Sequence, residues 1–82
     1  MSASQFTLIR AFGLAVRSRR ERLEISQESL AAIAGLHRTY VGSVERGERN
    51  VTLKNISALA RALKTTASQL LTETEKLQRE AR

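Results

Sequence analysis

Two short amphipathic segments on either side of Gly35 limit the fold of this chain more than any other feature. The first segment covers residues 27–34 and the second covers residues 38–46, and only Gly35, Leu36 and His37 separate them. Glycine ends helices because it adopts the left-handed backbone conformation without steric cost. Two helices joined by so short a turn must cross at a steep angle.

Apolar spacing predicts three further helices around this pair. Proline is absent and glycine occurs at only four positions, which favours helices over strands. Apolar residues recur every three or four positions over about 7–23 and 53–64, and again after residue 66. Residues that cap helix N-termini precede three of the helices: Ser26, Thr52 and Thr66. The predicted fold class is therefore all-α, a compact five-helix domain that covers residues 1–82.

The apolar face of each helix is expected to form the core. The residues on these faces of the first three helices are Ile9, Phe12, Val16, Leu23, Leu30, Ala31, Ile33, Ala34, Val41 and Val44. Arg20 shares the apolar face of the first helix, and an unpaired buried charge costs several kcal/mol. Glu45 follows Val41 by four residues on the inner side of its helix. We therefore predict a structural ion pair between Arg20 and Glu45.

A positive net charge favours a polyanionic partner. The chain has 14 Lys and Arg residues against 8 acidic ones, a formal net charge of +6. Many small proteins are basic for solubility alone, so the charge does not by itself select nucleic acid. RNA is the weaker choice, because single-strand readers display aromatic platforms and only Phe6, Phe12 and Tyr40 are aromatic here.

Several other function classes lack the residues that they need. Cysteine is absent and His37 is the single histidine, so we expect no disulfide, no metal site and no cofactor. All acidic residues are glutamate and no Gly-rich phosphate loop occurs, which argues against an enzyme. The chain also has no apolar stretch long enough for a membrane span or an export signal. These absences predict a cytoplasmic protein without membrane contact.

The segment around the short turn resembles the lambda-repressor-like family of helix-turn-helix proteins. The matching residues are Ser26, Gln27, Glu28, Leu30, Ala31, Gly35, Val44, Glu45 and Gly47. Residues 37–53, within a similarity over about 14–71, look like the controller proteins of bacterial restriction–modification systems. The resemblance implies a homodimeric transcriptional regulator that binds double-stranded DNA at a palindromic operator in its own promoter. A phage-type repressor, an antitoxin and a protein-interaction module that does not bind DNA are the alternatives.

The helix over 38–46 is expected to read DNA bases. With Val41 and Val44 in the core, its exposed side would carry Thr39, Gly42, Ser43 and Arg46. Arg38 stands at the N-terminal end, where such helices enter the major groove, and can donate two hydrogen bonds to guanine. Thr39 and Ser43 can contact a thymine methyl group or an acceptor, although solvated hydroxyls are the alternative. The base-reading residues are therefore predicted to be Arg38, Thr39 and Ser43.

A second set of residues is assigned to the DNA backbone: Gln27, Tyr40, Arg46, Arg49, Asn50 and Lys54. Gln27 begins a helix whose dipole favours an anion, and the basic residues would line a phosphate-binding edge. The resemblance implies the role of Tyr40, which would touch the backbone near the centre of the operator; core packing is its alternative. Gly42 either allows close approach to the groove or is a tolerated surface glycine.

The last two helices carry more large apolar residues than so small a core should bury. We assign five of them to a dimer interface: Ile56, Leu59, Leu63, Leu70 and Leu71. Dimerisation through about 52–72 would place two reading helices about 34 Å apart. The polar tail, 73–82, is expected to fray or to lie along the partner subunit. A bound dimer would recruit RNA polymerase or block it, depending on where it binds.

Overall fold

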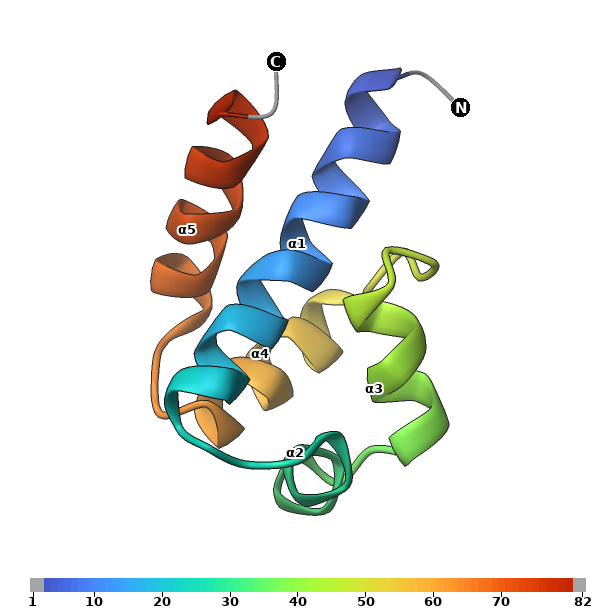
Figure 1. Cartoon of the computed structure of the whole chain (residues 1–82), viewed down its shortest axis with the longest axis vertical. Coiled ribbons are helices and arrows are strands. Elements are labelled where there is room, and N and C mark those ends of the chain that lie inside the picture. Colours follow the sequence, from blue (N-terminus) through green and yellow to red (C-terminus); the bar gives the residue numbers. More distant parts are fainter. Residues whose placement is uncertain (1–2, 81–82) are drawn as a thin grey trace.

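The computed structural model describes residues 3–80, with side chains described from Leu8 onward, and these residues form five α-helices (Figure 1). The helices are α1 Ala3–Arg22, α2 Gln27–Ala34, α3 Arg38–Glu45, α4 Leu53–Ala62 and α5 Ala67–Glu80. The predicted all-α, five-helix class is thus confirmed. Predicted and observed bounds agree within about two residues, except that α1 begins at Ala3 rather than near residue 7.

The long helices α1 and α5 lie side by side (Figure 1). Helix α3 packs against α1, and α2 packs against α3 and α4. The three predicted N-caps each accept a backbone hydrogen bond from the residue three positions on, at 3.0 to 3.2 Å: Ser26, Thr52 and Thr66. Gly35 ends α2 in the left-handed conformation, with φ of 71°. His37 occupies the N-cap position of α3, but its side chain makes no capping hydrogen bond.

All five helices contribute residues to one hydrophobic core. Its largest fully buried side chains are Val16, Leu30, Val41, Val44, Leu59, Leu63, Leu70 and Thr74. One predicted core residue is wrong, because Ile33 is 63% exposed. Ile33 precedes Ala34 by one residue, about 100° of helix rotation, and the short α2 buries only a narrow face centred near Ala31 and Ala34.

The structure also corrects part of the predicted dimer interface. Leu59, Leu63 and Leu70 are at most 1% exposed, so they belong to the core of the single chain. All three belong to the hydrophobic core cluster of the single chain, where α4 packs against α2 and α5 packs against α1, so these side chains are inaccessible to a partner. Ile56 and Leu71 are half-buried and line an apolar groove of about 100 Å³. Of the predicted interface, only these two side chains reach the surface.

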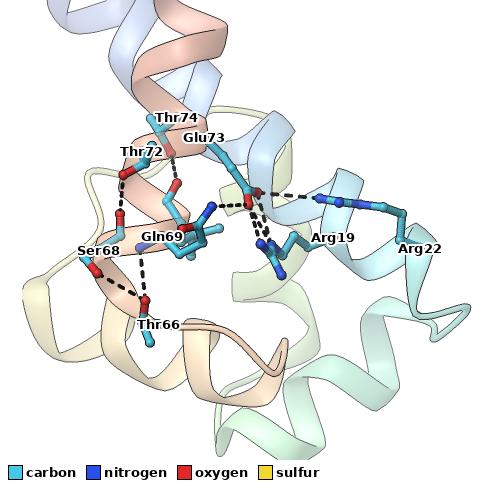
Figure 2. A network of polar contacts seen from close by, with 9 residues as sticks. Arg19, Arg22, Thr66, Ser68, Gln69, Thr72, Glu73 and Thr74 are labelled. Atoms are coloured by element: carbon cyan, nitrogen blue, oxygen red, sulfur yellow. Dashed lines mark hydrogen bonds and ion pairs between the residues drawn. The ribbon is translucent and has the colours of Figure 1, made fainter.

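Glu73 ties α5 to α1 through a polar network (Figure 2). The Nε of Arg19 lies 3.1 Å from both carboxylate oxygens of Glu73, and Arg22 approaches the same carboxylate at 3.6 Å. The hydrogen bond from Arg19 lowers the pKa of Glu73 below its ordinary value. Thr74, which is fully buried, donates to the carbonyl of Leu70 at 2.8 Å. The tail over 73–82 is predicted to fray or to lie along a partner subunit, and the structure shows it as helix through Glu80.

Among residues 3–80, no helix is both long enough and apolar enough to cross a lipid bilayer. The same residues bring together no group of three His, Cys, Asp or Glu side chains that would hold a metal ion.

Candidate nucleic-acid interface

A buried ion pair fixes α3 against α1. The Nε of Arg20 lies 2.7 Å from Oε2 of Glu45, and its Nη2 lies 3.0 Å from Oε1. The ion pair that the sequence predicts is therefore present, and it is bidentate. The remaining amino group of Arg20 donates to the carbonyl of Ile25 at 2.9 Å. The Glu45 side chain is 3% exposed, and its hydrogen bond raises the pKa of Arg20. This geometry sets the direction in which α3 presents its exposed face.

Gln27 takes part in the same cluster. Its amide nitrogen donates to Oε1 of Glu45 at 3.0 Å, and its side chain is half-buried. Its amide donor is therefore engaged within the protein, whereas the sequence suggested a free donor at the start of α2. The carbonyl oxygen of Gln27 points toward Gly42 on α3. Gln27 thus links the two helices of the helix-turn-helix.

Five residues from α2, from α3 and from the C-cap position of α3 line one hollow on the surface: Gln27, Arg38, Thr39, Gly42 and Arg46. The side chains of Arg38, Thr39 and Arg46 are exposed, as predicted, and Gly42, which also lines the hollow, is buried. The hollow therefore gathers two of the predicted base-reading residues beside two residues assigned to the backbone.

Ser43 does not lie on this exposed face, contrary to the prediction. It is 5% exposed, its hydroxyl donates to the carbonyl of Tyr40 at 2.7 Å, and it accepts a hydrogen bond from Nε of Arg49 at 3.0 Å. The physical reason is the loop after α3, which folds back and places Arg49 over this side of the helix. Gly42 is buried for a related reason, because the side chains of Gln27 and Arg46 stand over it.

Tyr40 is the centre of a second cluster, between α3 and α4. Its half-buried ring packs against the core, while the guanidinium carbon of Arg49 lies 5.6 Å from the ring centroid. The side-chain amide of Asn55 donates to the Tyr40 hydroxyl at 3.0 Å. The sequence pattern did not single out Asn55. The sequence feature that could have indicated it is its position three residues after the N-cap Thr52.

The loop between α3 and α4 supplies the remaining candidates. Arg46 forms an exposed ion pair with Glu48, at 3.1 Å from Nε to Oε2, which raises the pKa of Arg46 and lowers that of Glu48. Asn50 and Lys54 are exposed. Asn50 also borders the apolar groove that Ile56 and Leu71 line, so the basic edge and the groove adjoin.

Comparison with known proteins agrees with this geometry. The helix-turn-helix family matches residues 16–70, which include α2, α3, α4 and the turn between the first two. The chain is therefore a DNA-binding transcriptional regulator of the helix-turn-helix family, with a lambda-repressor-like fold.

Relatives narrow this class further. Over 57 residues the chain is 61% identical to control protein C.SmaI of Serratia marcescens, an alignment that covers 70% of this chain and 68% of that protein. The crystal structure of the restriction-modification controller protein C.AhdI from Aeromonas hydrophila is 48% identical, with a TM-score of 0.74 over 76% of this chain and 94% of that one. The chain belongs to the restriction–modification controller proteins, and its matched relatives are control proteins rather than enzymes.

A third similarity concerns the fold alone. The C.Esp1396I controller tetramer, solved in complex with its natural 35 base-pair operator, is 24% identical to this chain and has a TM-score of 0.81. The match covers 95% of this chain and 97% of that one, so the whole five-helix arrangement is shared.

Proposed function

We propose that the protein binds a palindromic operator as a homodimer and regulates its own promoter, with Arg38 and Thr39 in contact with base edges. The hollow on α3 carries this proposal, because it places an exposed arginine and a threonine at the start of a helix whose orientation is fixed by Arg20 and Glu45. Arginine recognises guanine through two hydrogen bonds, and threonine offers a hydroxyl and a methyl group. The operator complex of C.Esp1396I supports a similar use of the same fold.

Ser43 takes a different role in this proposal. Its hydroxyl already has a donor and an acceptor partner within the protein, so a base contact would break one of these hydrogen bonds. Ser43 would instead hold Arg49 in place beside Tyr40. Base readout then rests on Arg38 and Thr39.

The backbone-binding edge consists of Tyr40, Arg46, Arg49, Asn50 and Lys54 in this proposal. Arg46 must exchange its exposed partner Glu48 for a phosphate, which costs little because both side chains are more than half exposed. Arg49 and Tyr40 lie together, so a phosphate could meet a cation and a phenol at once. Gln27 would contribute to the DNA interface through its position next to Gly42, because its amide nitrogen already donates to Glu45.

Self-association would use the apolar groove between α1, α4 and α5. Ile56 and Leu71 line this groove, and Leu53, which is 76% exposed, lies on the same helix as Ile56. A second copy packed there would supply the second half-site contact that a palindrome requires. RNA polymerase would be the further partner of the bound dimer, in the cytoplasm of a bacterial cell.

Selection of bound duplexes from a random pool tests the proposal. The wild type should enrich an inverted repeat whose half-site centres are about one helical turn, or a multiple of it, apart. Arg38→Ala should enrich the same repeat with a relaxed preference at one position in each half-site. Enrichment of no sequence by the wild type, or of a single half-site without symmetry, would contradict the proposed function.

A further inference from the structure

The contact between Asn55 and Tyr40 shows whether the Tyr40 hydroxyl donates or accepts in this hydrogen bond. A phenol has one hydrogen to donate and can also accept a hydrogen bond, whereas the nitrogen of an asparagine amide only donates. Since the Asn55 nitrogen lies 3.0 Å from the phenol oxygen, Tyr40 is the acceptor in this bond. Among the described side chains, none accepts the hydrogen of the phenol itself. That hydrogen remains available for a ligand.

Asn55 is well placed to keep this arrangement fixed. Its backbone N–H donates to Oγ1 of Thr52 at 3.2 Å, within the capped first turn of α4. The side chain is half-buried, so neighbouring atoms restrict the positions that its amide can take. α4 therefore provides a rigid support for a donor that points at Tyr40.

The surroundings of Tyr40 favour an anion as the ligand for its free hydrogen. The guanidinium of Arg49 lies over the ring, and its Nε donates a hydrogen bond to the hydroxyl of Ser43. A hydrogen-bond donor next to a cation matches the oxygen atoms of a DNA phosphate. The ring itself packs against the core, so removal of the hydroxyl or of the Asn55 amide leaves the main packing contact of Tyr40 in place.

We propose that Asn55 is a positioning residue for operator binding, which holds the Tyr40 hydroxyl as a donor to a phosphate of the DNA backbone. The inference rests on the proposed function, because it requires that this face of α3 meets DNA. It adds a residue from α4 to the binding machinery. It also assigns Asn55 an effect that passes through Tyr40 instead of through a contact of its own.

A double-mutant cycle of Asn55→Ala and Tyr40→Phe tests this inference. Affinities are measured by titration on the selected operator and on a scrambled duplex. Each single substitution should weaken operator binding by about fivefold, the effect of one hydrogen bond of about 1 kcal/mol. The double variant should bind no more weakly than Tyr40→Phe alone, because Asn55 acts only through the hydroxyl. Thermal melts should place all three variants close to the wild type.

Asn50→Ala is the matched control, since this asparagine is exposed in the neighbouring loop. Its effect should add to that of Tyr40→Phe. If Asn55→Ala still weakens binding in the Tyr40→Phe protein, or has no effect in the wild type, the inference is wrong. If the wild type does not distinguish operator from scrambled duplex in the same titrations, the proposed function fails first. The two failures are thus separate.

Discussion

Gly13 of α1 lies against the carbonyl oxygen of Val44 at the end of α3, so close that a Cβ on residue 13 would be 2.3 Å from that oxygen. The same Cβ would be 2.8 Å from the carbonyl oxygen of Glu45. Both neighbours are backbone atoms, which cannot move aside as a flexible side chain can. The crossing of α1 and α3 therefore depends on a missing side chain as well as on the ion pair between Arg20 and Glu45.

Gly13→Ala should destabilise the fold, although alanine normally stabilises a helix by about 1 kcal/mol relative to glycine. The forced separation of the two helices should cost about 1 to 3 kcal/mol in chemical denaturation. Gly42→Ala is the control, because its Cβ would meet only the ends of the Arg46 and Gln27 side chains, at 3.2 and 3.4 Å. That variant should unfold at or above the wild-type midpoint. Equal stabilisation by both substitutions would contradict the close approach.

Glu45→Ala should destabilise the protein by about 3 kcal/mol or more, because it leaves Arg20 partly buried without its partner. Gln27 loses an acceptor in the same variant. Combined Arg20→Met and Glu45→Leu should recover much of the loss, since the apolar pair removes both charges. Thermal melts measure both effects. A Glu45→Ala protein that melts within a degree or two of the wild type would show that the pair does not stabilise the fold.

Arg38 and Arg49 should respond differently to DNA sequence and to salt. Arg38→Ala should cost about 1 to 3 kcal/mol per contacted base pair on the operator and leave binding to a scrambled duplex nearly unchanged. Arg49→Ala or Lys54→Ala should weaken binding to both duplexes. Each should also reduce the magnitude of the slope of log affinity against log salt by about one for each phosphate that the variant no longer neutralises. Titrations at several salt concentrations distinguish the two patterns. Equal decreases in affinity on both duplexes for Arg38→Ala would place Arg38 on a phosphate instead.

Leu71→Glu or Ile56→Glu should weaken self-association, and operator affinity with it, while the single chain still folds. Leu70→Glu should instead unfold the protein, because this side chain is fully buried. Ile33→Glu is the matched control on α2, where the isoleucine is 63% exposed and outside the groove. Sedimentation equilibrium reports the mass of each variant. A monomeric wild type that binds the palindrome tightly would remove the interface proposal.

Glu73→Gln should lower stability at neutral pH by about 1 kcal/mol, because it removes the charge that Arg19 and Arg22 share. The pKa of Glu73 is lower in the folded protein than its ordinary value of 4.5. The ion pair therefore contributes fully to the free energy of unfolding above about pH 4.5. This contribution is lost as the pH falls through the pKa that Glu73 has in the folded protein. The stability difference between wild type and variant should shrink over that acid range.

The control for this pH effect is Glu21→Gln, which removes a more exposed pair with Arg17 within α1. It should change stability by less than about 0.5 kcal/mol. Denaturation curves at neutral pH and below about pH 4 check both variants. A Glu73→Gln difference that stays constant across this range would contradict the assigned pairing.

The sequence by itself determined the five helices, their caps and the turn at Gly35, because these depend on residues close together in the chain. It also predicted the pairing of Arg20 with Glu45, since a charge on an apolar helical face has few ways to be satisfied. The same short segment indicated the family, and the helix-turn-helix family matches residues 16–70, which include α2 and α3.

Only the tertiary structure decided which exposed-looking residues are covered and which apolar residues stay at the surface. Ser43 has the helical position of a surface residue, but the loop that brings Arg49 back over α3 buries it. The apolar pattern assigns Leu59, Leu63 and Leu70 to a partner, although they are buried within the single chain, because periodicity cannot tell an intrachain neighbour from a second subunit. Asn55 became visible only when α4 placed its amide beside Tyr40. Each of these results depends on contacts between segments distant in sequence, which local spacing does not encode.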